Sequence, residues 1–306
     1  IYSGVDIREE DMERLREAMR LGTPVLVPSH RSHLDYLLIS SHLFEMGLVL
    51  PHVVAGENLS FWPVGTLFRR CGAFFIKRSF RDEKIFPVVF ARYVKQLIRD
   101  EFPLEFFIEG GRSRTGKLLP PKLGVLGMVL DAASEIRPDR DVSILPISIS
   151  YEQIAEEKAY ARELAGVGKE KESVRGVFRA RRHLNKRFGK VYIRVGEPIR
   201  LNAVFKQLDS RWKDLSPRHS QELLHSIGER IMYGIGRNML ILPTGITAMA
   251  LLSSSSGGIR LQHAQARAKR FDTLLRKQGA MSADSLTHGG WVVMEALNRF
   301  LREKWI

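Results

Sequence analysis

The residues best suited to chemistry are His30 and Asp35, which four residues separate in the stretch Val25–Tyr36. The apolar run before Pro28 predicts a buried strand, and the segment His33–Gly47 has helical spacing, so His30 falls on a strand-to-helix turn. A turn that folds His30 onto Asp35 lets the carboxylate orient the imidazole and stabilise its protonated form. Such a pair is a general base that can take a proton from a hydroxyl group.

The same stretch supports two other interpretations. Ser32 and Asp35 form an S-x-x-D pattern that is typical of a helix cap, which would make Asp35 a structural carboxylate. His30, His33 and Asp35 also suit a metal ion, but no companion motif occurs elsewhere, and we therefore expect no metal. This stretch alone leaves the choice between chemistry and capping open.

The composition is that of a globular protein with an excess of positive charge. The chain has 306 residues, 44% of them hydrophobic, which is enough for one large core or for one domain with an appended piece. Its net charge of +14 attracts phosphates, acidic proteins, nucleic acid or anionic lipid without choosing among them. The segment Lys169–Lys190 has nine basic and two acidic residues, a net of +7, and forms either a solvated face or a docking surface. The single cysteine, Cys71, fits a reducing compartment and is expected to serve packing.

Apolar patterns in the first two thirds of the chain alternate between strands and helices. Strands are expected near Val25 and over Leu50–Ala55, Ala73–Lys77, Leu104–Ile108, Val142–Ile149 and Val191–Val195. Helices are expected around Met12–Met19 and over His33–Gly47, Ser60–Arg70 with Ser60 as its cap, Lys84–Arg99 and Leu123–Ile136. The alternation predicts an α/β fold with a twisted, mostly parallel central sheet flanked by helices.

Beyond Leu201 the strand signal fades, and helices are expected over Gln221–Asn238, Arg260–Lys277 and Gly290–Lys304. We therefore expect an α/β domain over residues 1–201 and a helical C-terminal extension over residues 202–306. The apolar run Met239–Leu252 has 14 residues, whereas a membrane-spanning helix needs about 20, so core packing is its expected use. The first and last residues, Ile1 and Ile306, suggest an excerpt of a longer chain.

Polar side chains follow five of the expected strands, at the point where each strand ends. In chain order they are His30, Glu57-Asn58, Lys77-Arg78, Glu109–Arg114 and Ser150–Glu152. Ligands of open α/β sheets bind beyond the carboxyl ends of parallel strands. The sequence therefore predicts one site at this edge of the sheet.

The fourth cluster has the chemistry of a phosphate site. Arg112-Ser113-Arg114 and, in the third cluster, Arg78 supply guanidinium groups and a hydroxyl, and Gly110 and Gly111 allow close approach of the backbone. Glu109 is either a second acid or base or, more in keeping with its spacing from Arg112, a brace for the arginines. The spacing matches neither a nucleotide P-loop nor a dinucleotide fingerprint, so neither ATP nor NAD is indicated and no cofactor is expected.

Four blocks in this order are similar to those of a known family. They are His30-Arg-Ser-His-Leu-Asp35, Gly72-Ala-Phe-Phe-Ile-Lys-Arg78, Phe107-Ile-Glu-Gly-Gly-Arg-Ser-Arg114 and Ile144-Leu-Pro-Ile-Ser-Ile-Ser150. The chain resembles the bacterial glycerol-3-phosphate acyltransferases of the membrane-bound glycerolipid acyltransferase superfamily. The similarity extends through Ala55–Leu59 and, more weakly, the apolar run near Thr244, so it covers most of the chain.

The resemblance implies transfer of a fatty acyl group from acyl-CoA or acyl carrier protein to the 1-hydroxyl of glycerol 3-phosphate, giving lysophosphatidate. By matching position, His30 is the base and Asp35 its partner. The matching substrate-binding residues are Arg78, Glu109, Gly110, Arg112, Ser113 and, in the fourth block, Pro146. Lys77 stands where such proteins often have arginine and is left out of the assignment, because lysine lacks the bidentate fork. No residue supplies an acyl nucleophile, so direct attack on the thioester is expected.

Acylation of dihydroxyacetone phosphate or lysophosphatidate is an alternative within the superfamily. A non-catalytic basic protein that binds nucleic acid or an acidic partner is the alternative outside it. Only Phe178 and Phe188 interleave with the basic segment, and no nucleic-acid module occurs, so nucleic acid is not an expected partner. We expect peripheral association with an anionic membrane surface at the cytoplasmic face of the inner membrane, through Lys169–Lys190 and exposed apolar residues.

Overall fold

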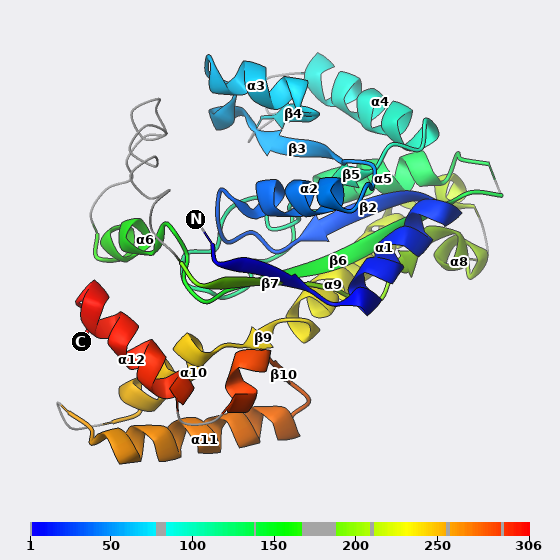
Figure 1. The fold of residues 1–306 in the computed structure, drawn as a ribbon. Coiled ribbons are helices and arrows are strands. Elements are labelled where there is room, and N and C mark those ends of the chain that lie inside the picture. Colours follow the sequence, from blue (N-terminus) through cyan, green and yellow to red (C-terminus); the bar gives the residue numbers. More distant parts are fainter. Residues whose placement is uncertain are drawn as a thin grey trace.

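The fold is built on a mixed sheet with helices on both faces (Figure 1). The structure is a computed structural model that describes residues 2–77, 84–137, 139–166, 188–208, 211–254, 258–288 and 291–306. Within these residues the sheet has eight strands, in the order β1-β7-β6-β2-β5-β3-β4, with β8 paired to β6. The strands are β1 (Gly4–Ile7), β2 (Gly22–Pro28), β3 (His52–Gly56), β4 (Ala73–Ile76), β5 (Leu104–Glu105), β6 (Asp141–Tyr151), β7 (Lys190–Val195) and β8 (Ile199–Arg200).

Most neighbouring strands of the sheet run parallel. β2 pairs in parallel with both β5 and β6, β3 pairs in parallel with β4 and β5, and β1 pairs in parallel with β7. Only β7 and β8 run antiparallel to β6. The expected fold class is therefore confirmed, and the carboxyl ends of β2, β3, β4, β5 and β6 share one edge.

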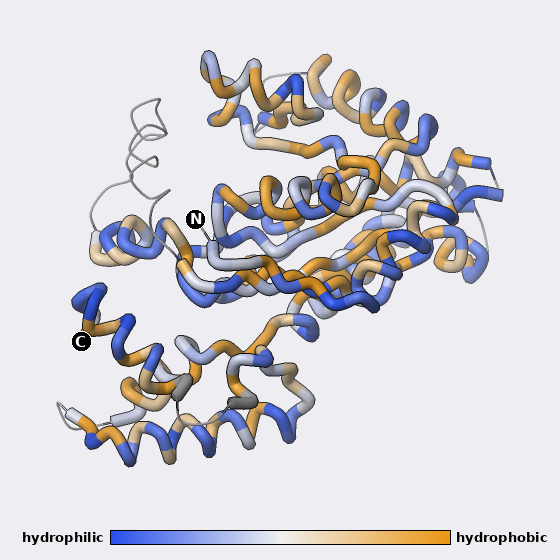
Figure 2. Tube along the Cα trace, in the orientation of Figure 1, coloured by the Kyte–Doolittle hydropathy of each residue, from blue (hydrophilic) through white to orange (hydrophobic). Residues whose placement is uncertain are grey.

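Alternating side chains of the strands divide the core between the two faces of the sheet. On one face Leu145 and Ile147 of β6 pack with Met12 of α1 (Glu9–Leu21) and Ile39 of α2 (Asp35–Glu45). On the other face Ile144 belongs to a cluster with residues of α4 (Ile85–Arg99), α5 (Gly124–Ala133) and α9 (Pro217–Arg237). Figure 2 shows the hydrophobic residues that gather along the central strands. Since the side chains alternate in this way, the sheet is buried on both faces.

Two expected elements differ from the structure. The helix expected from Ser60 is α3 (Val64–Arg70), with Pro63 rather than Ser60 at its N-cap position, because residues Glu57–Leu59 form a separate 3-10 turn. The strand expected over Leu104–Ile108 pairs only over Leu104–Glu105. The Phe106 N–H still donates to the Leu26 carbonyl oxygen (3.1 Å), and the chain then leaves the sheet towards the polar loop.

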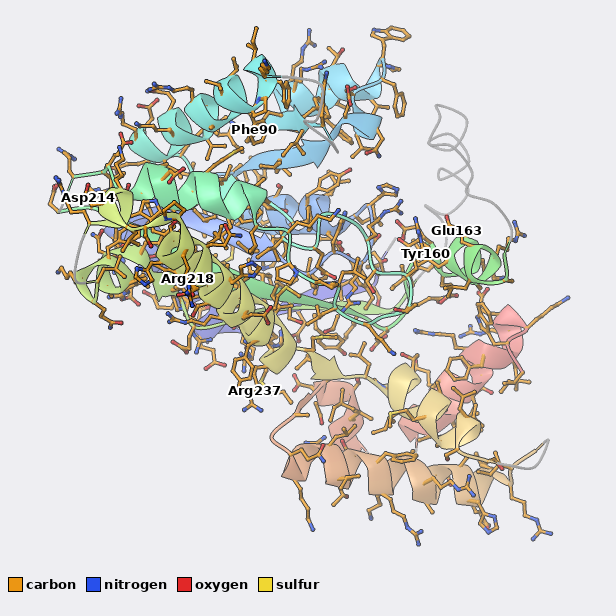
Figure 3. The ribbon with its side chains drawn as sticks, turned by 180° about the vertical axis from the view of Figure 1, so that it is seen from behind. Phe90, Tyr160, Glu163, Asp214, Arg218 and Arg237 are labelled. Carbon is orange, nitrogen blue, oxygen red and sulfur yellow. The ribbon has the colours of Figure 1, made fainter. Side chains whose placement is uncertain are left out.

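The chain beyond β8 first returns to the sheet and then forms a helical layer. Helix α6 (Glu157–Leu164) lies earlier, between β6 and β7. After α8 (Leu201–Lys206), helix α9 crosses the back of the sheet, as seen with Arg218 and Arg237 in Figure 3. Below lie α10 (Pro243–Leu252), α11 (Leu261–Lys277), α12 (Trp291–Glu303) and the paired strands β9 (Leu240–Ile241) and β10 (Met281–Ser282). They have their own small core, which includes Ile246, Ala250, Ala268 and Val293.

The division after residue 201 stays a prediction, and the packing of α9 favours a later boundary. Ile227, Ile231 and Ile235 of α9 have no exposed surface and belong to the same cluster as Ile144 of the sheet. Ile246 and Ala250 are buried in α10, whereas Met249 and Leu252 are exposed, so the apolar run Met239–Leu252 is used in packing on one face of the helix. Within the described ranges, none of the helices is both long and apolar enough to cross a bilayer.

We predict that Ile231→Ala lowers the free energy of unfolding of the sheet domain by about 2–5 kcal/mol, because it leaves a cavity between α9 and the sheet. The control is Tyr233→Ala on the same helix, where 69% of the residue is exposed and the change should stay within about 0.5 kcal/mol. Urea unfolding measures both variants. Equal effects would show that α9 is not part of the core of the sheet.

Candidate active site

The structure brings His30 and Asp35 together at the carboxyl end of β2. The Nδ1 atom of His30 lies 2.9 Å from Oδ2 of Asp35, which is the first residue of α2. The same Oδ2 accepts the backbone N–H groups of Arg31 (2.7 Å) and Ser32 (2.9 Å). Asp35 therefore braces the turn at the start of α2 and orients His30 at the same time, so the two interpretations of the sequence are compatible.

His30 is held on its ring face as well as at Nδ1. Its imidazole stacks on Phe107, with 3.9 Å between ring centroids and 23° between planes. The side chain keeps 16% of its surface exposed, whereas that of Asp35 keeps none. When Nδ1 donates its proton to Asp35, the lone pair of Nε2 is the one available to accept a proton. The arrangement is that of a general base at a partly open edge.

Tyr151, the last residue of β6, completes the environment of Asp35. Its hydroxyl donates to Oδ1 of Asp35, the oxygen that the turn leaves unused. Burial and the nearby Asp35 carboxylate raise the pKa of Tyr151 well above its usual range. The buried carboxylate thus accepts hydrogen bonds on both oxygens, as a buried charge requires.

Glu109 braces the site through backbone contacts. Its Oε1 accepts the backbone N–H of His30 (2.9 Å), and its Oε2 accepts that of Leu119 (2.8 Å). The side chain is buried, with both oxygens engaged by the backbone. Glu109 therefore stabilises the turn of His30 and the loop that contains Leu119. It does so through hydrogen bonds to the backbone, whereas the sequence predicted that it would brace the arginines. Its place in substrate binding stays a prediction.

The glycine-rich loop after β5 is tied to the turn of His30. Ser113 donates its backbone N–H to the carbonyl oxygen of His30 (2.9 Å) and its hydroxyl to the carbonyl oxygen of Lys117. Gly110 has a φ of +62°, and an added Cβ would lie 2.5 Å from Cδ of Lys122. Residues other than glycine rarely adopt this φ, so glycine at position 110 allows the sharp turn that returns the loop to the site.

Arg112 lies between the loop and α6. Its Nη1 donates to the Tyr160 hydroxyl (3.0 Å) and lies 3.9 Å from a carboxylate oxygen of Glu156. Glu156 in turn accepts the hydroxyl of Ser32 and the backbone N–H of His33. Tyr160 and Glu163 mark α6 in Figure 3. Arg112 is therefore connected to the turn of His30 through α6, with 16% of its side chain exposed.

The other assigned residues lie further away or outside the described ranges. Pro146 is buried in the middle of β6, its carbonyl oxygen accepts the Gly196 N–H (2.8 Å), and its ring lies against Gly234 of α9. This places Pro146 in the sheet, under the site. Lys77 follows β4, three strands from β2, about 14 Å at the usual strand spacing. Arg78 lies outside the described residues, so its role stays a prediction.

Sequence reasoning missed several contributors. Tyr151 and Phe107 belonged to the polar clusters or similar blocks but were given no role. Glu156 and Tyr160 gave no signal, because their contacts with the turn of His30 join residues more than 100 positions apart. Arg31 is also buried, and its Nη1 donates to the carbonyl oxygen of Lys117 (3.3 Å). Burial lowers the pKa of this guanidinium, and Glu109 and Asp35 oppose that shift.

Two further observations concern metals and nucleophiles. Among the residues that the structure describes, no group of three His, Cys, Asp or Glu side chains is placed to hold a metal ion. Cys71 is exposed, so its expected role in packing is wrong. It precedes β4, and its thiol therefore lies at the amino end of that strand, at the opposite edge of the sheet from His30.

We predict that Glu109→Gln lowers the free energy of unfolding by about 1–3 kcal/mol, because an amide accepts with only one oxygen and leaves one backbone N–H without a partner. The control is Glu45→Gln on α2, whose side chain is 70% exposed. Urea unfolding of both variants measures the difference. A Glu109→Gln variant as stable as its control would contradict the bracing role.

Two protein families match consecutive parts of the chain. Residues 6–150 match the family described as Acyltransferase, and residues 160–306 match the one described as the glycerol-3-phosphate acyltransferase C-terminal region. Among solved structures, the 1-acyl-sn-glycerophosphate acyltransferase of Thermotoga maritima aligns over 74% of this chain and 84% of its own. With 19% identity and a TM-score of 0.35, that likeness is too distant to carry an argument.

Curated relatives named glycerol-3-phosphate acyltransferase match nearly the whole chain. The protein of Histophilus somni is 39% identical over 90% of this chain and 34% of its own length. The protein of Pasteurella multocida is 40% identical over 83% of this chain and 32% of its own length. The protein of Shewanella pealeana is 36% identical over 94% of this chain and 36% of its own length. The chain thus spans about a third of the length of these relatives. On these matches, the chain belongs to the family of the bacterial glycerol-3-phosphate acyltransferases.

Proposed function

We propose that this chain carries the catalytic site of an enzyme that transfers a fatty acyl group to the 1-hydroxyl of sn-glycerol 3-phosphate. The acyl donor is a thioester, acyl-CoA or acyl carrier protein, and the product is lysophosphatidate, the first intermediate of phospholipid synthesis. The observation that carries the proposal is the contact of His30 Nδ1 with the buried Asp35 carboxylate at 2.9 Å. The family match supports the substrate class.

The geometry of the pair suits deprotonation of an alcohol. Nε2 of His30 takes the proton of the acceptor hydroxyl while the oxygen attacks the thioester carbonyl. Asp35 stabilises the imidazolium that forms. When the tetrahedral intermediate collapses, the C–S bond breaks, an ester remains and His30 returns its proton to the leaving thiolate. The proton balance closes without a covalent acyl-enzyme, which agrees with the position of Cys71 at the opposite edge.

The phosphate of the acceptor requires a cation near this pair. Arg112 meets that need, since the loop that carries it is bonded to the backbone of His30 through Ser113. Its guanidinium contacts the Tyr160 hydroxyl and lies 3.9 Å from Glu156, and the planar fork of a guanidinium matches the geometry of a phosphate. Gly110, Ser113 and Arg78 are the further binding residues in this proposal. A bound phosphate then positions the hydroxyl next to His30.

We predict that His30→Ala lowers the turnover number about 10²- to 10⁴-fold, because it removes the general base. Asp35→Asn should fall between the wild type and His30→Ala, since an amide keeps the shape but loses the charge. Acyl transfer to glycerol 3-phosphate from one acyl-CoA, with circular dichroism as the control for folding, measures both. Near-wild-type turnover of a folded His30→Ala variant would exclude the base assignment.

We further propose peripheral contact with an anionic bilayer at the cytoplasmic face of the membrane. The expected basic segment, residues 169–190, lies almost wholly outside the described residues. Support comes instead from α4, where Ile85 (77%), Val88 (60%) and Val89 (59%) are exposed at helical spacing. Trp62, just before α3, and Leu67 of α3 are also exposed. Helix α3 lies beside α4 at the top of Figure 1. Figure 2 has the same orientation.

The charge around these apolar side chains suits anionic lipid. Arg69 and Arg70 of α3 and Lys84 and Arg92 at α4 are all exposed. Basic residues near an anionic leaflet contribute up to about 1 kcal/mol each, and apolar side chains add contact that salt does not screen. Since α4 follows the carboxyl end of β4, Ile85 lies at the edge of the sheet that carries His30, where a lipid product would leave.

We predict that the double change Ile85→Glu and Val89→Glu weakens binding to anionic phospholipid vesicles at least tenfold, because it replaces apolar contact by repulsion. The matched control is Leu274→Glu on α11, which is 53% exposed and far from α4 in Figure 1. Vesicle co-sedimentation at several salt concentrations measures the binding. Unchanged binding of the double variant, or an equal loss in the control, would contradict the role of α4.

A further inference from the structure

The two carboxylate oxygens of Asp35 have hydrogen-bond partners from different parts of the chain. Oδ2 is bonded within the local turn, by the backbone of Arg31 and Ser32 and by His30. Oδ1 accepts the hydroxyl of Tyr151, which is 116 residues away in the sequence. Among the hydrogen bonds of the described residues, this is the one that ties the side chain of Asp35 to another strand of the sheet.

The position of the Tyr151 hydroxyl is set by the sheet. β6 pairs in parallel with β2 up to Pro28 and Ile147, and the Ile149 N–H then donates to the Ser29 hydroxyl (3.0 Å). Tyr151 itself pairs with Val191 of β7 on the other side. Its ring is almost fully buried and lies 5.4 Å from the ring of Tyr2. A strand bonded on both sides therefore holds the phenol in one place.

A fixed donor on Oδ1 has two consequences for His30. The carboxylate cannot rotate about its Cβ–Cγ bond without breaking this hydrogen bond, so Oδ2 stays in line with Nδ1. The donor also offsets part of the negative charge that His30 faces. Because burial and Asp35 raise the pKa of Tyr151, its hydroxyl stays protonated and remains a donor across the neutral range.

We propose that Tyr151 is a positioning residue of the acyl transfer, which fixes the Asp35 carboxylate and, through it, the orientation and titration of His30. This inference rests on the proposed function of the His30 and Asp35 pair. Tyr151 acts through Asp35, because its hydroxyl donates to Oδ1 of Asp35, whereas the imidazole of His30 contacts Oδ2.

Other ionisable groups also face this pair, and the removal of the Tyr151 hydroxyl changes none of these side chains chemically. They are Tyr2 at the N-terminal segment, Arg31 in the turn, Glu105 in β5, Glu109 and Arg112 in the loop after β5, and Glu156 and Tyr160 at α6. The Glu105 side chain is wholly buried, and neither of its carboxylate oxygens has a hydrogen-bond partner among the residues that the structure describes. Burial and, to a smaller extent, the Asp35 charge raise the pKa of Glu105 well above its usual range. The same ionisable groups therefore surround His30 and Asp35 in the wild type and in the variant.

The test removes one hydroxyl and compares it with an equivalent loss elsewhere. Tyr151→Phe keeps the ring and its packing against Tyr2. The matched control is Tyr192→Phe on β7, because the Tyr192 side chain is also buried and its hydroxyl also contacts a carboxylate, that of Glu152 (3.2 Å). Thermal unfolding of both variants shows whether each is folded before kinetics are measured.

For Tyr151→Phe we expect a turnover number about tenfold lower and a Michaelis constant for glycerol 3-phosphate within twofold of wild type. The acidic limb of the pH profile of kcat/KM should move to higher pH, because the Asp35 carboxylate loses a hydrogen-bond donor and attracts a proton on His30 more strongly. Tyr192→Phe should change neither quantity. An unmoved limb in Tyr151→Phe, or an equal shift in the control, would overturn the proposal.

A second readout does not depend on activity. In protein with ¹⁵N-labelled histidine, the NMR titration midpoint of the His30 ring should rise in Tyr151→Phe and stay at the wild-type value in Tyr192→Phe. If the wild-type protein showed no acyl transfer, the proposed function would be refuted. The NMR titration would still test whether Tyr151 positions Asp35 and His30. An identical His30 midpoint in wild type and Tyr151→Phe would refute that role even in an active enzyme.

Discussion

A carboxylate without any exposure to water is the constraint on which the site depends. Burial of the Asp35 side chain removes its hydration, and the cost is several kcal/mol unless other donors replace the water. Two backbone N–H groups, His30 and the Tyr151 hydroxyl are those donors. Because each donor must come from a fixed direction, satisfying this one charge also fixes the imidazole of His30.

The parallel sheet is what allows these donors to meet. The turn of His30 follows β2, Glu109 follows β5 and Tyr151 ends β6, and the three strands are neighbours with their carboxyl ends at one edge. Glu109 then bonds the backbone of His30 to that of Leu119, and Ser113 bonds the same turn to the arginine loop. The arginine loop, which we propose binds phosphate, and the proposed base are thus held relative to each other by hydrogen bonds to the backbone, which is the preorganisation that acyl transfer needs.

Local patterns made part of this site predictable. The four residues between His30 and Asp35 predicted their contact, since a strand-to-helix turn closes over such a distance, and the polar residues after five strands predicted the edge. The contacts of Tyr151 and Glu156 could not be predicted in this way, because they depend on strand order and on the position of α6. Similarly, the helical pattern of α9 did not reveal which hydrophobic core the helix joins. Ser60 does not cap α3, because it follows the 3-10 turn of Glu57–Leu59 and the helix begins only at Val64.

The most direct measurement is an experimental structure of the protein with glycerol 3-phosphate bound, in which the position of the acceptor is compared with His30. We expect the 1-hydroxyl oxygen to lie within hydrogen-bond distance, about 2.6–3.2 Å, of Nε2 of His30, and the phosphate to contact the guanidinium of Arg112. A phosphate bound away from Arg112, with the 1-hydroxyl farther from Nε2 than one bridging water allows, would contradict it.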